Sequence, residues 1–361
     1  MGNLTHKCIG LMSGSSLDGV DVVSCTFYYE GTSLKEWSLD KSQFFELNQL
    51  LKTRISNFKT LDPIGIKKLD LDLGNFFGQC IKEHAKENLI STDVVGVHGQ
   101  TIYHLPKEKL TCQLGNGMAL HTELQVPIVC DFRTKDILAG GVGTPMAPLA
   151  DENLFSGHDF YLNLGGIANI SFKNEKEEWI AYDVCPFNQF TNHYAAKLDL
   201  PFDKDGKLGG IGVSKDPMVQ QLLSYPYFSM KPPKSLDNNW IVESFIPNAE
   251  KLGYSEKDAL SSFYNFAVTA VCSTINTIPK EGKRSMLVTG GGAYNGYFIE
   301  LLGEKLASKG VNVVIPTKDI IDYKEALLIA LAASFKCIGK PNFYSSVTGA
   351  RESVCGGVLY N

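Results

Sequence analysis

Residues 9–25 read IGLMSGSSLDGVDVVSC and place a polar knot between two apolar runs. The runs 7–14 and 19–29 are predicted to be strands that flank this knot. A hairpin needs only about two to five turn residues, and none of them has to be charged or hydroxylated. The segment from Ser13 to Gly19 is therefore either an ordinary turn or a site that holds a small, charged ligand.

A similar pattern returns later in the chain. Residues 160–173 read FYLNLGGIANISFK, again an apolar strand, a turn with two glycines and a second strand. Elsewhere, Val- and Ile-rich runs alternate with apolar residues at helical spacing, as over 63–89, which is typical of an α/β fold. The repeated pattern predicts two related halves rather than one long sheet.

Two long helices are predicted in the second half of the chain, over 256–278 and 322–337. Ser255 is followed three residues later by Asp258, which resembles a capping box at the start of the first helix. Asp322 and Glu325 have the same spacing and predict a capping box for the second helix.

The segment AGGVGTPMAP, residues 139–148, is rich in glycine and proline and is predicted to link the two domains. A chain of 361 residues is too long for one ordinary core and suits two domains. We expect a first domain of residues 1–140 plus about 325–361, and a second domain of 141–324.

Composition excludes several classes of function. The net charge of −5 offers no basic footprint for nucleic acid. No apolar run approaches the roughly 18 residues that span a bilayer, so no membrane partner is expected. The nine cysteines form no C-x-x-C pair, which argues against a disulfide framework or a structural zinc site and favours a cytoplasmic location.

Three turns that contain glycine follow apolar strands, at residues 13–19, 164–169 and 289–295. Glycine lets backbone N–H groups approach anionic oxygens closely, so the set of three favours phosphate binding. The chain has no G-x-x-x-x-G-K-[ST] loop. Residues 290–295, GGGAYN, miss the third glycine of the dinucleotide fingerprint, which leaves a dehydrogenase as a weak alternative.

Six blocks together resemble the 1,6-anhydro-N-acetylmuramic acid kinases. They are spread in the family's order from about residue 8 to residue 355, and they read IGLMSGSSLDGVDVV, GVHGQTIYH, DFRTKDILAGGVGTPMAP, LNLGGIANIS, VTGGGAYN and SVTGA. The resemblance implies an α/β, two-domain actin-like ATPase fold of the RNase H-like type with a cleft between the domains. It also implies ATP and Mg²⁺ as cofactors.

The resemblance places ATP on the glycine-containing turns. Gly14–Asp21 would form the first phosphate loop, with Asp18 near the transferred phosphoryl group and Mg²⁺, directly or through water. The expected ATP-binding residues are Gly14, Ser15, Ser16, Leu17, Asp18, Gly19, Val20, Asp21, Gly165, Gly166, Gly291, Gly292 and Asn295. Oriented donors and a divalent cation are what phosphoryl transfer requires.

The family's reaction opens an anhydro bridge by hydrolysis and phosphorylates the oxygen that is released. Asp183 matches the family's general base, and it is expected to be catalytic together with Asp18 and Glu325. The sugar-binding residues implied by the resemblance are His98, Gln100, Thr101, Arg133, Asp183 and Glu325. An arginine fork could bind the lactyl carboxylate of a muramyl sugar through two hydrogen bonds.

The chain departs from the family at one important turn. The family usually has D-T-G-P-G-N where this chain has DVCPFN, so Cys185 and Phe187 replace two glycines. These side chains could narrow the backbone's approach to a ligand. Residues 234–240, KSLDNNW, lack an arginine–glutamate pair that is common there.

The resemblance therefore predicts a kinase for 1,6-anhydro-N-acetylmuramic acid in cell-wall recycling, with a possible homodimer. The alternatives are a kinase for another 1,6-anhydrosugar, or a nucleotide-binding homologue with weak catalysis.

Overall fold

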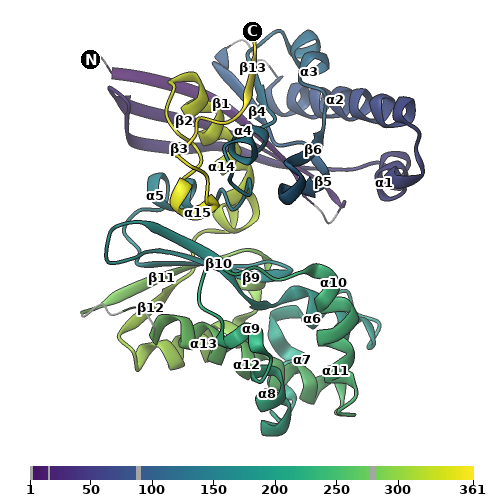
Figure 1. The fold of residues 1–361 in the computed structure, drawn as a ribbon, viewed down its shortest axis with the longest axis vertical. Helices are drawn as coiled ribbons and strands as arrows, with labels where there is room; N and C mark the ends of the chain where they lie inside the picture. Colours follow the sequence, from purple (N-terminus) through teal and green to yellow (C-terminus); the bar gives the residue numbers. More distant parts are fainter. Residues whose placement is uncertain (1–2, 15–16, 87–90, 277, 279–281) are drawn as a thin grey trace. The chain divides into compact units, whose positions relative to one another are not determined.

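The computed structural model describes residues 3–14, 17–86, 91–276, 278 and 282–361 (Figure 1). The chain folds into two compact units. The first runs from the start of the chain to Ser156 and resumes at Tyr323–Asn361, and the second is Gly157–Asp322.

The first unit is built on a sheet in the order β13-β7-β4-β1-β2-β3. Its strands are β1 (Asn3–Ser13), β2 (Gly19–Glu30), β3 (Ser33–Glu46), β4 (Val94–Val97), β7 (Ile128–Cys130) and β13 (Val358–Tyr360). β1, β2 and β3 form an antiparallel meander, β4 is parallel to β1, and β7 is parallel to β4. The predicted hairpin of residues 7–14 and 19–29 is therefore confirmed.

Helices cover both faces of this sheet. α14 (Lys318–Cys337) packs directly on β1 and β4, where a Cβ atom at Gly10 would collide with the Ala326 carbonyl oxygen and one at Gly96 would lie 2.6 Å from the Ile329 carbonyl oxygen. On the opposite face, α2 (Pro63–Ala85) and α3 (Gly117–Leu124) share an apolar core with the strands. The predicted helix over 63–89 thus exists and ends at Ala85.

The second unit repeats this topology. Its sheet has the order β10-β9-β8-β11-β12, with β8 (Phe160–Leu164), β9 (Ile167–Lys173), β10 (Trp179–Pro186), β11 (Arg284–Thr289) and β12 (Val311–Val314). β8, β9 and β10 are antiparallel neighbours, β11 is parallel to β8, and β12 is parallel to β11. These directions match β1, β2, β3, β4 and β7, which confirms the predicted duplication.

The core of the second unit surrounds α12 (Glu256–Asn276), whose aromatic residues pack against β10, α6 (Asn188–Ala196) and α13 (Gly296–Ala307). The remaining helices and strands are α1 (Gln49–Ser56), β5 (Gln100–Leu105), β6 (Leu110–Leu114), α4 (Thr134–Leu138), α5 (Ala147–Asn153), α7 (Lys207–Ile211), α8 (Asp216–Leu223), α9 (Pro226–Ser229), α10 (Asn238–Trp240), α11 (Ile246–Glu250) and α15 (Ser345–Thr348). In the part of the chain that the structure describes, no helix has the length and apolar character needed to cross a membrane.

The first unit extends further along the chain than residue 140. Residues 139–148 are not a linker, because they fold around Asp136, whose side chain is fully buried. Asp136 accepts hydrogen bonds from the Gly143 N–H at 2.8 Å and the Thr348 hydroxyl at 2.8 Å. The glycines of residues 139–148 thus build tight turns around a buried carboxylate. The division between the two units lies at 156/157 instead of 140/141.

The two capping predictions had different outcomes. The N-cap half of the first box is confirmed, because the Asp258 N–H donates to the hydroxyl of Ser255, the residue before α12, at 3.2 Å. The Asp258 carboxylate accepts from the Val213 N–H at 2.8 Å. The box at Asp322 and Glu325 was wrong, because α14 begins four residues earlier, at Lys318. Asp322 instead forms an ion pair with Lys318 and accepts a hydrogen bond from the Tyr294 hydroxyl.

Candidate active site

The turn after β1 holds an exposed carboxylate on a fixed base. Asp18 is solvent-exposed, and its Oδ1 accepts a hydrogen bond from the Gly19 N–H at 3.0 Å. The backbone carbonyl of Asp18 accepts from the Leu47 N–H at 3.0 Å, while Leu17 has a left-handed φ of 57°. Ser15 and Ser16 lie outside the described residues.

The turn is shorter than the predicted loop Gly14–Asp21, because β2 begins at Gly19. A Cβ atom at Gly19 would collide with the Phe45 carbonyl oxygen and the Phe44 ring, so packing against β3 requires glycine there. Val20 is buried in the core, whereas Asp21 is half-buried in β2. Of the predicted loop residues in the described part of the chain, Gly14, Leu17 and Asp18 lie in the turn itself.

Gln100 connects this turn to β5. Its Oε1 accepts a 2.7 Å hydrogen bond from the Ser13 hydroxyl, and both side chains are buried. The neighbouring Thr101 is half-buried, and its hydroxyl accepts from the Gln113 amide at 3.3 Å. Gln100 therefore fixes the end of β1 from which the polar turn leaves.

His98, which is buried, and Arg133, which is half-buried, form a pair beyond the carboxyl ends of β4 and β7. The Arg133 Nε–H donates to His98 Nε2 at 3.1 Å, so the His98 proton is on Nδ1, which donates to the Gly99 carbonyl at 2.9 Å. Burial, reinforced by the Arg133 charge, lowers the pKa of His98 to about 3. His98 is thus a neutral acceptor that orients the guanidinium.

Arg133 and Glu325 influence one another electrostatically within the first unit. Burial lowers the pKa of Arg133 to about 10, and the charge of Glu325 opposes that shift. The Glu325 side chain is solvent-exposed, yet surrounding protein raises the pKa of its carboxyl by desolvation, against the effects of Arg133 and Lys324. Lys324 itself is held by a buried ion pair with Asp151 at 2.6 Å. The predicted sugar residues His98, Arg133 and Glu325 are therefore neighbours.

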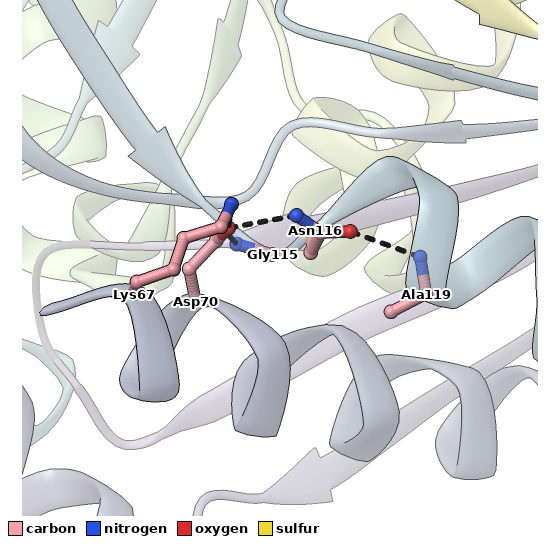
Figure 2. Close-up of polar contacts among 5 residues, drawn as sticks. All are labelled: Lys67, Asp70, Gly115, Asn116 and Ala119. Atoms are coloured by element: carbon pink, nitrogen blue, oxygen red, sulfur yellow. Dashed lines mark hydrogen bonds and ion pairs between the residues drawn. The ribbon is translucent and has the colours of Figure 1, made fainter. Parts of the chain in front are cut away.

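A polar pocket of about 260 Å³ opens on the α2 side of His98. Asp70 organises one wall, since its carboxylate accepts hydrogen bonds from the Gly115 N–H at 3.0 Å and the Asn116 amide at 2.9 Å (Figure 2). Lys67 pairs with the same carboxylate at 2.7 Å, and Asn116 caps α3 by accepting from the Ala119 N–H (Figure 2). The Asp70 carboxylate thus mainly holds this wall together.

In the second unit, two turns meet at one edge of the sheet. The Gly165 carbonyl accepts from the Asn188 N–H at 3.0 Å, and the Gly166 carbonyl accepts from the Phe187 N–H at 2.9 Å. The Asn188 amide also donates to the Leu164 carbonyl at 3.2 Å. The turn that carries the two glycines is therefore fixed by the residues that follow β10.

The third glycine turn follows β11 at the same edge. Gly290 has a φ of 79°, and a Cβ atom there would lie 2.6 Å from Asn163 Oδ1, so the position requires glycine. A Cβ atom at Gly292 would lie 2.5 Å from the Phe187 ring, whereas one at Gly291 would have no neighbour closer than 3.7 Å. Gly291 therefore leaves room for a ligand, while Gly292 is needed for packing.

The Asn295 side chain is occupied within the fold. Its Oδ1 accepts from the Phe298 N–H at 2.9 Å and caps α13, and its amide donates to the Tyr264 hydroxyl at 2.8 Å. Tyr264 in turn donates to the buried Asp203 at 2.8 Å. The geometry gives Asn295 a role in shaping the loop, and its predicted contact with ATP stays a prediction.

Asp183 lies on β10 at a β-bulge. Asp183 is paired with Asn169 and Cys185 with Ala168, so Val184 is the extra residue. The bulge reverses the alternation of side chains, leaving Asp183 half-buried at the surface of the sheet and turning Cys185 into the core. Desolvation raises the pKa of Asp183, and a 2.8 Å hydrogen bond from the Leu236 N–H to its Oδ2 opposes that shift.

Cys185 and Phe187 do not narrow the site as the sequence had suggested. Cys185 is 0% exposed and Phe187 is 1% exposed. The Phe187 ring packs edge-on against Phe298 with centroids 4.7 Å apart, beneath Gly292. Both replacements of the family's glycines are therefore absorbed by the core of the second unit.

Sequence reasoning assigned no role to three residues near these groups, although Lys234 opens the segment 234–240 and Thr289 opens the turn 289–295. Tyr227 and Lys234 contact Asp183 or its surroundings, although nothing in the local sequence signals it. Thr289, directly before the three glycines, has a buried hydroxyl without a hydrogen-bond partner among the described residues. Its place at the end of β11 was the signal that could have identified it.

The two sheets share five strands in one arrangement, three antiparallel followed by two parallel, to which the first sheet adds β13, and this duplicated arrangement is that of the actin-like ATPase class. Turns of glycine and carboxylate residues at the strand ends fit the phosphotransferases among these proteins. The anhydro-N-acetylmuramic acid kinase family model matches residues 6–361, and the chain belongs to this family.

Two bacterial relatives that bear the family's name match over nearly the whole chain. An anhydro-N-acetylmuramic acid kinase of Rhodopseudomonas palustris is 31% identical, over 97% of this chain and 98% of that protein. One from Haemophilus influenzae is 29% identical, over 98% of this chain and 97% of that protein. Among solved structures, component A of the Acidaminococcus fermentans (R)-2-hydroxyglutaryl-CoA dehydratase is 12% identical, with a TM-score of 0.46, and the match covers 93% of this chain and 100% of that one.

Proposed function

We propose that this protein uses ATP to convert 1,6-anhydro-N-acetylmuramic acid into N-acetylmuramate 6-phosphate. The observation that carries the proposal is the position of Asp183, held on a bulge at the sheet edge where the glycine turns of the second unit gather. A carboxylate held there can accept a proton beside a phosphate donor bound at these turns, which supports the proposal. Membership of the kinase family supplies the reaction class.

In the proposed reaction, Asp183 removes a proton from a water molecule while that water attacks the anomeric carbon. The bond from this carbon to the bridging oxygen breaks, and the released oxygen attacks the γ-phosphorus of ATP. The bond between the γ-phosphorus and the oxygen that joins it to the β-phosphate then breaks, and ADP leaves with that oxygen. The raised pKa of Asp183 suits a base that must hold the proton once it arrives.

We assign Arg133 to the lactyl carboxylate of the sugar. Its Nε–H is bound to His98, so a carboxylate would be held by the two terminal nitrogens. A neutral His98 orients the guanidinium without competing for the anion. Glu325, whose pKa is raised, is assigned to a hydroxyl or amide of the same sugar.

We assign the phosphates of ATP to the turn after β1 and to the turns at Gly165–Gly166 and Gly291. Asp18 is exposed and carries the charge that a divalent cation needs. No three His, Cys, Asp or Glu side chains within the described ranges are grouped as a metal site. Mg²⁺ suits a site built on the Asp18 carboxylate, because this cation binds through one or two carboxylates together with phosphates and waters. It would neutralise charge on the transferred phosphoryl group.

A kinase for another 1,6-anhydrosugar is the second candidate. The assignment of Arg133 to a carboxylate argues against a neutral sugar as that substrate. The weakly catalytic homologue loses its main support, since Cys185 and Phe187 lie in the core. The homodimer stays a prediction from the family resemblance, and the cytoplasmic location stays a prediction from the cysteine pattern and that resemblance.

The test is ADP release from MgATP in the presence of 1,6-anhydro-N-acetylmuramic acid, levoglucosan or no sugar, with the product identified by phosphorus NMR. Turnover with the muramyl sugar alone, giving a 6-phosphate, is the expected result. Turnover with levoglucosan at an equal rate would assign a different substrate, and ATP binding without turnover on either sugar would contradict the proposed reaction.

A further inference from the structure

Residues 227–236, here called the strap, touch Asp183 at both ends. The Tyr227 hydroxyl donates to the Asp183 backbone carbonyl at 2.6 Å. At the other end, the Leu236 N–H donates to Asp183 Oδ2 at 2.8 Å. The strap therefore holds both the backbone and the carboxylate of the residue to which we assign the base.

Lys234 closes the strap. Its ammonium donates to the Tyr227 carbonyl at 3.1 Å. The same nitrogen lies 4.7 Å from the centre of the Tyr227 ring and 5.5 Å from the centre of the Tyr182 ring. A cation between two aromatic faces gains electrostatic attraction that grows as water is excluded. Lys234 is half-buried, so water screens these contacts less than it would at an exposed site.

We propose that Lys234 is a positioning residue for the proton transfer at Asp183, acting through the strap. By tying residue 234 to Tyr227, it keeps the Leu236 N–H on one carboxylate oxygen and leaves the other oxygen to meet the proton. This inference rests on the proposed function, because it concerns the residue assigned there as the base.

The titratable groups near Asp183 are Cys185 on its own strand and Tyr227 on the strap, and Tyr182 and Lys234 lie beside these two. Burial raises the pKa of the Cys185 thiol and of the Tyr182 and Tyr227 hydroxyls, so these three groups are neutral at physiological pH. Lys234 is the charged member of the set. Desolvation and the Leu236 hydrogen bond are what shift the pKa of Asp183, so the influence of Lys234 runs through the strap.

The experiment compares the pH dependence of kcat/KM for the unmodified protein, Lys234→Met, Lys234→Arg and Lys231→Met. Lys231 is an exposed lysine of the same strap and is the matched control. A hydrogen bond to the ionised carboxylate favours the charged form, so its loss in Lys234→Met should move the acid limb up by about one pH unit. That shift corresponds to roughly a tenfold loss at a pH below the limb and little loss well above it. Lys234→Arg and Lys231→Met should retain the original limb.

A titration of the Asp183 carboxyl by carbon NMR, assigned with Asp183→Asn, measures the same shift without turnover. An acid limb and a carboxyl titration that are unchanged in Lys234→Met would overturn the inference. Turnover absent from the unmodified protein, with the carboxyl titration still shifted in Lys234→Met, would instead overturn the proposed function. Where Lys234→Met does not fold, Tyr227→Phe removes the other end of the strap, and an unchanged titration in that variant would also contradict the inference.

Discussion

The two sheets have one topology, but their first hairpins differ in what the turn offers. In the first unit, the turn between β1 and β2 is long and polar and presents the exposed carboxylate of Asp18. In the second, Gly165 and Gly166 join β8 to β9, and their carbonyls accept hydrogen bonds from residues that follow β10. The second unit carries its carboxylate on a different strand, at Asp183.

The difference teaches how a duplicated fold can divide a reaction. A short glycine turn whose carbonyls already accept hydrogen bonds has no charged side chain, so a charged group has to come from a neighbouring strand. The bulge after Asp183 supplies that group. We therefore expect Asp18 to act on phosphate and cation and Asp183 to act on the proton, and each variant below tests one side of this division.

The largest effect is expected for Asp183→Asn. Removing the base should lower kcat by about 10³-fold or more, within the usual range for general bases. ATP affinity, measured by calorimetry, should change less than about threefold, because the charge for phosphate and cation is on the other unit. An equal loss of ATP binding and turnover would make Asp183 a structural residue.

Phe187→Ala should be the most costly change in stability. The ring is buried against Phe298 and Phe263, and such truncations cost about 3–5 kcal/mol. Denaturant unfolding of the purified variant measures this, and its KM for sugar should stay near the original value. A large rise in KM with unchanged stability would mean that Phe187 faces the ligand.

Asp18→Asn should lower kcat by about 10²-fold and raise the Mg²⁺ concentration needed for half-maximal activity, since one anionic ligand is lost. Titration of activity with Mg²⁺ at saturating ATP is the measurement. Glu36→Gln, at an exposed carboxylate of β3, is the comparison variant and should keep the original Mg²⁺ requirement. An unaltered Mg²⁺ requirement in Asp18→Asn would remove the proposed cation contact.

Arg133→Ala should raise the KM for the muramyl sugar by about 10- to 100-fold, the cost of losing hydrogen bonds to a carboxylate. A sugar whose lactyl carboxylate is esterified should be much less affected. Arg133→Lys should restore little, because lysine lacks the fork. A KM that rises equally for acid and ester would argue against the carboxylate contact.

The smallest effect concerns pH. The pKa of folded His98 is about 3, below the unfolded value near 6.5, so the unfolded chain takes up a proton first as the pH falls. His98 therefore supports stability above pH 6.5, and this support is lost progressively below that value. Between pH 7 and 5, the unmodified protein should lose about 1–2 kcal/mol more than His98→Gln in chemical unfolding. Equal losses would show that His98 is protonated in the folded state.

Buried strands such as β1 and β8 could be predicted because they are runs of apolar residues followed by glycine and polar residues. β3 (Ser33–Glu46) was not predicted, because none of its residues is fully buried and its sequence is largely polar. The domain boundary was not predicted either, since glycines at 139–148 look the same in a flexible linker and in tight turns around Asp136. The contacts of the strap with Asp183 could not be predicted from the sequence for another reason. Tyr227 and Leu236 lie 44 and 53 residues beyond Asp183, and contacts at that separation come from tertiary packing alone.

The misread capping box has the same origin. Asp322 and Glu325 have the right spacing, but the helix already extends from Lys318, so both lie within it. Local sequence defines which pairs can cap a helix and tertiary packing decides where the helix begins. Glu325 is consequently released from a capping role and is available for the one that the resemblance implies.

The close packing of α14 on β1 has a consequence for genetics. Gly10 lies under the backbone of Ala326, the residue next to Glu325. Any side chain at Gly10 would push α14 away from β1. In a saturation scan of variants scored by growth on the sugar, Gly10 should tolerate no replacement, like a residue that takes part in the reaction. Gly10 would then score like a catalytic residue although it has no side chain, because it determines how far the Glu325 carboxylate stands from the sheet without touching it.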